Sequence, residues 1–220
     1  MKKIISSILI IIGISLIVSP FINDLIIKNR VEISKEIIGE MTVEQIEKND
    51  QQEAVYEYDD IQNVEIISTI ASTMDMDKAE INENIIGQII IDDLNINLPI
   101  LKGITHSNLL IGAGTMKPDL VMGEGNYSLA SHYSKNNQLF GGLLKIEKGA
   151  IVKITNKKVV YEYMIYDTQI VPDTALYMLD NNRADKRGKP ILSLMTCYYT
   201  SKNGKRFFAL GELVDQYPYK

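Results

Sequence analysis

The 220-residue sequence has little of what several common classes of function require. It contains one cysteine and two histidines, which is too few for a zinc cluster of cysteine and histidine ligands. Its net charge is −5, so it has no basic excess with which to bind nucleic acid. It has no phosphate-binding loop, no dinucleotide-binding glycine motif and no internal repeat. What remains is one globular domain with additional segments, since 45% of the residues are hydrophobic.

The N-terminus has the features of a membrane anchor. Residues 4–22 contain no charged side chain, and as a helix they would span roughly 28 Å, close to the hydrocarbon thickness of a bilayer. Lys2 and Lys3 precede this run and favour a cytoplasmic N-terminus with the rest of the chain outside the cell. The run is longer than the apolar part of a signal peptide and lacks a small-residue cleavage site. We therefore expect residues 1–27 to be a retained single-pass anchor in the cell membrane.

The following segment, residues 28–84, is expected to be an extracellular stem. It is rich in charged and amide side chains, and its apolar residues repeat only partly at helical spacing. Those residues are Ile33, Ile37, Ile38, Met41 and Ile46. This pattern favours weak helix and flexible chain at the surface, which would give the next domain reach from the membrane.

From residue 85 onward, the chain changes to short apolar runs of strand type. We expect strands over 86–91, 95–100, 127–132, 151–155, 159–171, 191–200 and 206–214. A hairpin turn is expected at Asn156-Lys157-Lys158, and residues 109–114 should form one helical turn. Short strands at this spacing indicate an all-β barrel or sandwich. The connection over 172–190 is long for a compact domain, and such loops are often functional.

The lone thiol belongs to Cys197, within Ser193-Leu194-Met195-Thr196-Cys197. Outside the cell, a cysteine without a disulfide partner is exposed to oxidation and cross-linking. Its presence there favours use as a nucleophile.

The last two strands can be aligned from the sequence. Asn203-Gly204 is a strong hairpin signal and predicts a two-residue type I′ turn. That turn would pair Ser201 with Arg206 and place Cys197 opposite Leu210. Alternate residues of a strand point to the same face, so Arg206 and Cys197 would lie on one face of the sheet. Their backbones would be about 13 Å apart along the ladder. From there the guanidinium of Arg206 would reach a substrate bound at the thiol. The alternative interpretation is that Arg206 is a solvated charge at the edge of the sheet.

The base that serves the thiol must be His132 or His106. His132 ends a run of small residues before a polar loop, where side chains converge on a site. His106 lies in Ile104-Thr105-His106-Ser107-Asn108, which should begin a short helix, and its simpler interpretation is an exposed loop histidine. Residue chemistry favours His132 but leaves both open.

Four stretches together resemble a class A sortase, a membrane-anchored cysteine transpeptidase of Gram-positive bacteria. They are Gly112-Ala113-Gly114-Thr115-Met116-Lys117-Pro118, Gly125-Asn126-Tyr127-Ser128-Leu129-Ala130-Ser131-His132, Leu194-Met195-Thr196-Cys197 and Arg206. The resemblance runs from residue 86 to the C-terminus and includes the anchor. It implies an eight-stranded β-barrel with short helices over residues 85–220.

The resemblance also implies the reaction. A C-terminal Leu-Pro-x-Thr-Gly sorting signal would be cleaved between Thr and Gly, and the surface protein would be transferred to an amine of a peptidoglycan precursor. Cys197 would form the thioacyl-enzyme, His132 would be the general acid and base, and Arg206 would hold the oxyanion or the peptide backbone.

Matching motif positions also suggest the substrate contacts. Ala130 and Met195 should line the groove, and Met178 and Leu179 in the long connection should receive the Leu-Pro portion. Plain core packing is the alternative for all four.

The chain departs from the family pattern in two places and suggests no metal site. Ser131 stands where glycine is usual, and Ser193-Leu194 where Thr-Leu is common. Both changes put fine specificity in doubt and remove no reacting group. Some relatives bind calcium near the long connection, but Asp173 and Asp180 do not make a ligand set there, so no cofactor is expected.

Another extracellular cysteine enzyme is disfavoured, because the papain type places Cys before His and the L,D-transpeptidase type carries a Ser-x-Gly stretch that is absent here. Two alternatives stay open at this point. The chain could be a pilin-polymerising or sporulation-related sortase. It could also be a non-enzymatic, membrane-tethered peptide-binding β-domain, in which Cys197 would be dispensable.

Overall fold

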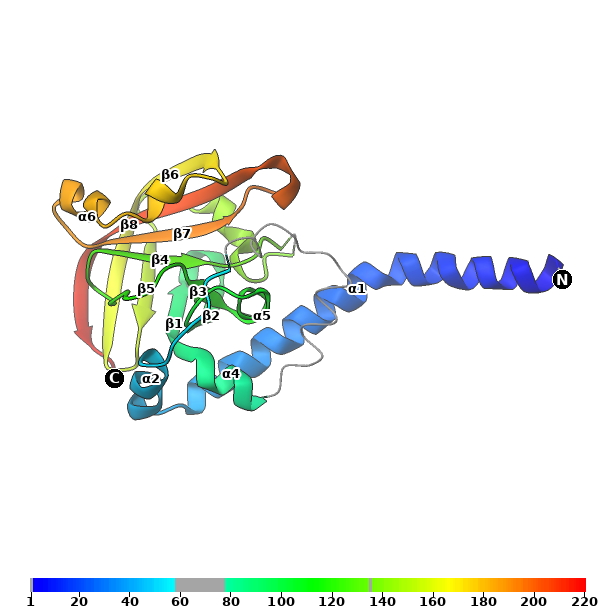
Figure 1. Ribbon diagram of the computed structural model, residues 1–220, viewed down its shortest axis with the longest axis horizontal. Coiled ribbons are helices and arrows are strands. Elements are labelled where there is room, and N and C mark those ends of the chain that lie inside the picture. Colours follow the sequence, from blue (N-terminus) through cyan, green and yellow to red (C-terminus); the bar gives the residue numbers. More distant parts are fainter. Residues whose placement is uncertain (1, 58–77, 135) are drawn as a thin grey trace.

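The computed structural model describes residues 2–57, 78–134 and 136–220, and its centre is a closed β-barrel (Figure 1). Around the barrel the strands follow the order β1-β2-β3-β4-β7-β8-β6-β5. Their bounds are β1 Ile85–Ile91, β2 Ile96–Leu101, β3 Ala113–Thr115, β4 Asn126–Ala130, β5 Ile151–Thr155, β6 Val159–Pro172, β7 Ile191–Cys197 and β8 Lys205–Pro218. The barrel predicted from the sequence is thus confirmed.

The barrel is mixed, because two of its strand pairs are joined by crossovers instead of hairpins. β2 pairs with β3 and β4 with β7 in parallel, and the other neighbours are antiparallel. The predicted turn between β5 and β6 is present. There the Asn156 side chain accepts hydrogen bonds from the N–H groups of Lys158 (3.1 Å) and Val159 (3.0 Å). This is the usual way in which asparagine stabilises a tight turn.

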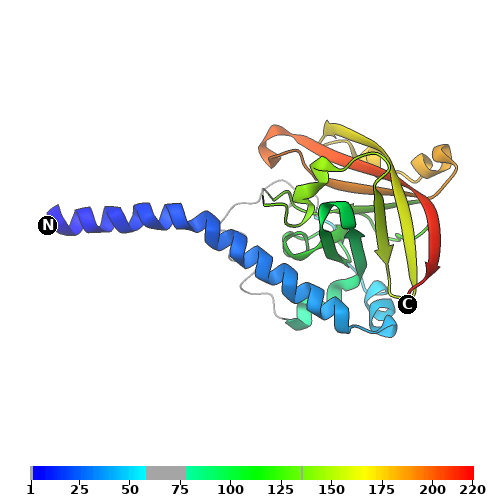
Figure 2. The ribbon, with the colours of Figure 1, turned by 180° about the vertical axis from the view of Figure 1, so that it is seen from behind.

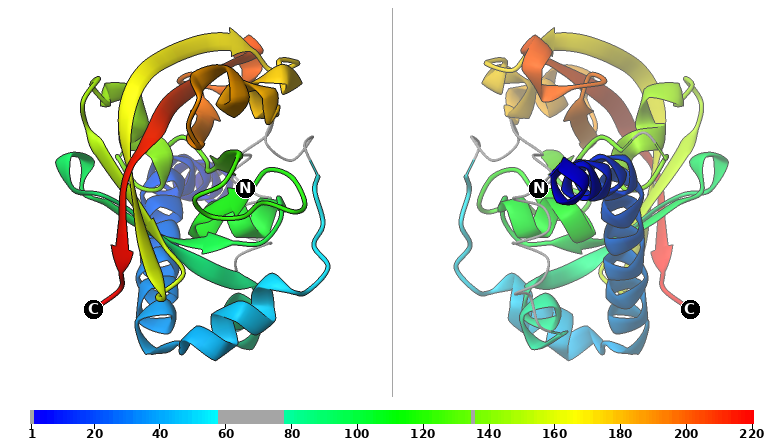
Figure 3. Two further views of the ribbon diagram at one scale, coloured as in Figure 1. Left: turned by 90° about the vertical axis from the view of Figure 1, so that its left-hand side faces the viewer. Right: turned by 90° about the vertical axis from the view of Figure 1, so that its right-hand side faces the viewer.

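Short helices connect and flank the strands. They are α2 Val43–Asp50, α4 Lys78–Asn84, η2 Asp92–Leu94, α5 His106–Ile111, η3 Phe140–Lys145, η4 Leu176–Leu179, α6 Asn182–Arg187 and η5 Ser201–Asn203. Thr105 caps α5, since its side chain accepts a hydrogen bond from the N–H of Asn108 at 3.1 Å. The predicted helix start at His106 is therefore confirmed. Views from the two ends show the 173–190 connection on the side of the barrel away from α2 and α4 (Figure 3).

Alternate residues of each strand fill the barrel. Leu192 and Leu194 of β7 point inward and belong to the main apolar core with Tyr127 and Leu129 of β4. The intervening residues therefore point to the outer face, since side chains of a strand alternate between faces. Met195 and Cys197, at the end of β7, therefore point to the outer face of the barrel.

The first helix, α1 (Lys2–Glu40), does more than connect the barrel to the N-terminus. Its N-terminal part projects away from the barrel, whereas its C-terminal part lies along it (Figures 1 and 2). Ile27 and Val31 are buried in the main core, and Ile38 packs with Met41 and Ile46 against the start of β1. Val31, Ile38, Met41 and Ile46, which belong to the segment expected to be a flexible surface stem, thus contribute apolar packing, and residues 58–77 of that segment lie outside the described residues. The proposed domain boundaries themselves stay predictions.

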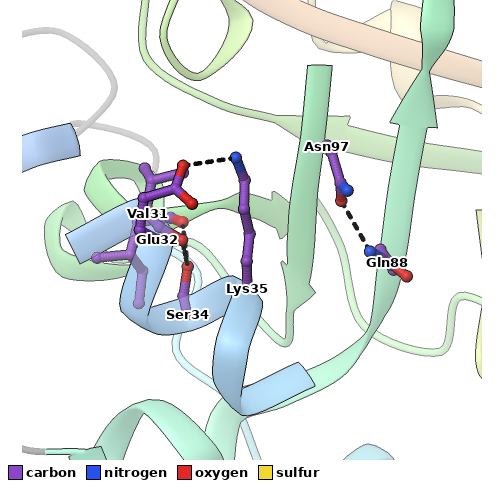
Figure 4. Close-up of polar contacts among 7 residues, drawn as sticks. Val31, Glu32, Ser34, Lys35, Gln88 and Asn97 are labelled. Carbon is purple, nitrogen blue, oxygen red and sulfur yellow. Dashed lines mark hydrogen bonds and ion pairs between the residues drawn. The ribbon is translucent and has the colours of Figure 1, made fainter. Parts of the chain in front are cut away.

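Polar contacts also hold α1 on the barrel. The Ser34 hydroxyl lies 2.7 Å from the carbonyl oxygen of Val31 and 3.1 Å from that of Ile111 at the end of α5. Figure 4 shows this hydroxyl beside Val31, and the Glu32–Lys35 ion pair (2.9 Å) on the same turn of the helix. At the end of α1, Lys157 donates to the carbonyls of Gly39 and Met41, both at 2.9 Å. A cation at this position stabilises a helix C-terminus.

The projecting part of α1 is a candidate membrane span. The helix is long and apolar enough to cross a bilayer. The large apolar side chains that the structure describes between Ile4 and Leu25 are exposed, and burial begins at Ile27. The boundary between exposed and buried apolar residues therefore falls where the predicted anchor ends.

We predict that Ile38→Ala destabilises the protein by about 2–5 kcal/mol, because it leaves a cavity between α1 and the barrel. Ile38 is 1% exposed in that contact. The free energy of unfolding is measured by denaturant titration of the chain in detergent, with Glu36→Ala, on an exposed position of the same helix, as the matched control. Equal stability of the two variants would show that α1 is not packed as described.

Candidate active site

Cys197 and Arg206 lie directly opposite each other at the ends of β7 and β8. The predicted register, with Cys197 opposite Leu210, is therefore wrong, because Leu210 pairs with Ser193. The predicted sharing of a face is retained, since directly opposed residues of an antiparallel pair point to the same side. The two side chains thus start from neighbouring backbone positions, not from points about 13 Å apart.

The error arose from the loop between the two strands. The Asn203-Gly204 pair does not form a two-residue hairpin, and a 3₁₀ turn, η5, occupies its place. The Asn203 side chain donates to the carbonyl of Tyr198 (2.6 Å) and accepts from the N–H of Lys205 (2.9 Å). By bonding both ends of the loop, Asn203 stabilises a wider turn, and β7 ends at Cys197 instead of Thr200.

His132 reaches the same edge of the barrel from β4. Ala130 pairs with Met195 in the parallel β4–β7 ladder, and the N–H of Ser131 donates to the Met195 carbonyl at 3.2 Å. His132 and Cys197 each lie two residues beyond that pair, so they stand at the same level on adjacent chain segments. The imidazole and the sulfur are therefore on one side of the barrel.

The three side chains are buried together and share electrostatic contacts. His132 is 2% exposed, Arg206 3% and Cys197 4%. Burial lowers the pKa of His132 to about 3, with further contributions from His106 and Arg206. Burial raises the pKa of the Cys197 thiol, which Arg206 opposes and Asp173 reinforces. The Arg206 guanidinium is close enough to act on both groups.

Asp173 is a member of this cluster that the sequence did not identify as such. The sequence shows it only as a carboxylate in the long connection and suggests no role for it. In the structure its Oδ2 lies 3.9 Å from Nη2 of Arg206, and its N–H donates to the Gly204 carbonyl at 2.9 Å. Asp173 thus links the long connection to the loop before β8 and partly neutralises the guanidinium.

The outer face next to Cys197 is apolar and contains all four predicted substrate contacts. Ala130, Met195, Met178 and Leu179 are buried in one cluster, which Phe208 of β8 also joins. The 173–190 connection therefore folds over this face and brings Met178 and Leu179 onto it. Whether these side chains contact a substrate is not decided by their packing, and that role stays a prediction.

Two polar residues that the sequence did not single out hold the connection in place. Asn126 donates to the carbonyls of Met178 (2.9 Å) and Asp180 (3.2 Å) and accepts from the Ser193 hydroxyl (2.7 Å). Lys117 donates to the carbonyl of Leu179 at 2.7 Å. Both lie within the family-like motifs, but neither residue type by itself signals a contact with a loop more than fifty positions away.

His106, the other candidate base, is also close to the site. Its ring and that of His132 meet edge to face with centroids 5.4 Å apart. His106 is half-buried, whereas neither ring nitrogen of His132 has a hydrogen-bond partner among the described residues. Register and burial place His132 beside Cys197 and Arg206. His106 contacts His132 through its ring.

Asp173 and Asp180 do not form a metal site with other residues that the structure describes. Within residues 2–57, 78–134 and 136–220 there is no group of three or more His, Cys, Asp or Glu side chains suited to hold a metal ion. The cofactor expectation stays untested.

Comparisons with known proteins agree with this geometry. Residues 89–214 match the family model described as "Sortase domain". The chain is 35% identical to sortase A of Listeria monocytogenes over 214 residues, covering 97% of this chain and 91% of that protein. It is 33% identical to sortase A of Streptococcus agalactiae, covering 86% of this chain and 75% of that protein.

Solved structures show the same fold. The crystal structure of Listeria monocytogenes sortase A matches with a TM-score of 0.58 and 34% identity, over 62% of this chain and 92% of that one. Sortase C-3 of Streptococcus pneumoniae matches with a TM-score of 0.61 at 19% identity, over 86% of this chain and 93% of that one. The chain belongs to the sortase family, and it is a sortase transpeptidase of class A.

Proposed function

We propose that this sortase cleaves a C-terminal Leu-Pro-x-Thr-Gly sorting signal between Thr and Gly and transfers the surface protein to an amine of a peptidoglycan precursor. The observation that supports this most directly is the meeting of Cys197, Arg206 and His132 at the rim of one apolar face. A nucleophile, a cation and an acid–base group in one place are what acyl transfer requires.

In the proposed first step, the Cys197 sulfur attacks the Thr carbonyl while its proton passes to His132. The pKa of the thiol is raised and that of the imidazole is lowered, so both groups are neutral before substrate arrives. A neutral imidazole is the form that accepts the thiol proton. The resulting imidazolium then protonates the leaving Gly amine as the C–N bond breaks.

Arg206 would stabilise the proposed oxyanion by donating hydrogen bonds to it. The guanidinium presents several N–H donors, of which one donates to the carbonyl of Lys205 (3.1 Å) and another faces Asp173. The remaining donors are available to the oxygen that becomes negative when the carbonyl is attacked. In a buried site, such a charge-assisted hydrogen bond is stronger than in water.

The apolar outer face is the proposed place of the Leu-Pro portion of the signal. Ala130 and Met195 form its floor beside Cys197, and Met178 and Leu179 cover it from the 173–190 connection. Because Asn126 and Lys117 bond backbone carbonyls of that connection, the cover is held in a defined position over the strands. Its side chains would then select an apolar residue and the fixed bend of proline.

For location, we propose a single-pass protein with the N-terminus in the cytoplasm and the catalytic domain outside the cell. The candidate span in α1 and the two lysines before it support this orientation. Its partners there would be secreted surface proteins and the cell-wall precursor.

The main experiment mixes the detergent-solubilised chain with a quenched Leu-Pro-x-Thr-Gly peptide, with and without an amine acceptor, and follows cleavage and transfer. Cys197→Ala should abolish both reactions. His132→Ala should slow them by about 10²–10⁴-fold, the usual contribution of a general acid–base. Arg206→Lys should slow them by roughly 10²-fold or more, because an ammonium cannot replace the planar fork.

Arg30→Lys, on α1 and outside both the cluster and the 173–190 connection, is the matched control and should retain the activity. Cleavage by Cys197→Ala at the wild-type rate would contradict the proposal and favour the peptide-binding alternative.

Asp173→Asn should lower the pKa of the Cys197 thiol. The carboxylate raises this pKa, and its removal also leaves Arg206 free to favour the thiolate. The midpoint of the rate of thiol alkylation against pH should therefore move to lower pH, with Asp180→Asn, an exposed position in the same connection, unchanged. A midpoint that stays in place or moves upward would mean that Asp173 does not act on the thiol.

A further inference from the structure

When the acceptor is an amine, the transfer reaction releases two protons from its nitrogen, and His132 accounts for only one of them. An amine of ordinary basicity arrives as an ammonium, R–NH3⁺, and must lose two protons to become an amide nitrogen. It loses the first before attack, to free its electron pair. It loses the second when the C–N bond forms and the C–S bond breaks, and His132 returns that proton to the departing Cys197 sulfur. The first proton therefore needs another acceptor.

His106 is the second imidazole of the described site. Its ring lies edge to face with that of His132, with centroids 5.4 Å apart. His132 is 2% exposed, whereas His106 is half-buried: its Nε2 is a buried atom, while other atoms of the residue reach solvent. An imidazole in such a place can take a proton from a molecule in the site and release it to water.

The backbone holds the two imidazoles in this arrangement. Thr105 caps α5 immediately before His106, and the Ser131 hydroxyl, immediately before His132, donates to the carbonyl of Gly112 at 2.6 Å. Ser131 thus joins the end of β4 to the end of α5. The residue that departs from the usual glycine therefore links the elements that carry both histidines.

The side from which the amine would enter follows from where the peptide is placed. In the barrel, β4 lies between β3 and β7. Cys197 and Arg206 are on the β7 side of His132, whereas α5 with His106 precedes β3 on the other side. The apolar cluster extends across β4 to Leu109 of α5, so it borders both sides. A scissile carbonyl held between Cys197 and Arg206 would leave the His106 side to the incoming amine.

We propose that His106 is a second base of the transfer reaction, which takes the first proton from the incoming ammonium of the acceptor and passes it to water. This inference rests on the proposed function of the site. The freed R–NH2 then attacks the thioacyl carbonyl, the C–N bond forms, the C–S bond breaks, and the second proton passes through His132 to the sulfur. Water as the acceptor loses only one proton during its attack, so hydrolysis does not need His106 in this role.

Other charged or titratable groups surround the pair. They are Arg206 on β8, Asp173 after β6, the Cys197 thiol on β7 and Glu57, whose N–H donates to the Ile104 carbonyl at 2.9 Å, two residues before His106. Arg206 and Asp173 act on the thiol side of His132. Glu57 lies on the His106 side, so a Glu57→Gln variant is included to separate its charge from the effect of the imidazole.

The test compares transfer and hydrolysis by His106→Gln with those of the wild-type chain in detergent. Two acceptors are used at pH 7.5, triglycine with an α-amino group of pKa about 8 and an acceptor with a lysine ε-amino group of pKa about 10.4. The ratio of transfer to hydrolysis should fall by about tenfold or more with the ε-amine and less with triglycine. The defect should diminish as the pH rises, because the amine then arrives already deprotonated.

Ser107→Ala, on the same turn of α5, is the matched control and should keep the wild-type ratio. An equal fall of transfer and hydrolysis in His106→Gln would overturn the inference and indicate a merely structural role. A fall of the transfer-to-hydrolysis ratio that is equal for both acceptors would do the same. A fall of the ratio in Glu57→Gln alone would assign the role to the carboxylate instead. Absence of peptide cleavage by the wild-type chain would count against the proposed function itself, so the two failures are distinguishable.

Discussion

The parallel pairing of β4 with β7 is the contact on which the site depends. It sets Ala130 beside Met195 and so brings residues 132 and 197 to one level at the same edge of the barrel. The antiparallel pairing of β7 with β8 then adds Arg206 directly opposite Cys197. Both ladders are made of backbone hydrogen bonds between buried strands, which are costly to shift because a slip would turn apolar side chains to the wrong face.

Burial gives this cluster its chemical character. Removing the thiol, the imidazole and the guanidinium from water disfavours the thiolate and the imidazolium, while Arg206 and Asp173 act on the thiol in opposite directions. The resting cluster is consequently a neutral thiol and a neutral imidazole beside a partly neutralised cation. A neutral thiol is less prone to oxidation, since the thiolate is the reactive form.

The helix α1 connects the candidate membrane span directly to the barrel. Ile27 and Val31 are buried in the barrel core only a few residues after the exposed apolar run ends. Because the same helix is continuous through both parts, the barrel is carried as a body on that helix and not on a loose tether. The distance and orientation of the catalytic edge relative to a bilayer would then be properties of the fold.

Much of this could be predicted from residue types and local patterns. The apolar run of 4–22, most strand positions, the turn at Asn156 and the choice of Cys197 follow from hydrophobic period, turn chemistry and the rarity of a lone thiol. The residues of the site could be proposed before their positions were known, because reactive side chains and family-like motifs are visible in the chain itself. The packing of Ile38 was not foreseen, since a partial helical period does not show which surface it meets.

The sequence by itself determined which groups are available for chemistry, namely one sulfur, two imidazoles and a guanidinium at the end of a strand. Only the tertiary structure decided their arrangement. The bonds that Asn203 makes across the last loop replaced the expected hairpin and moved Arg206 opposite Cys197. Asp173, Asn126 and His106 joined the site because contacts between distant segments depend on the closed barrel, and no local pattern records them.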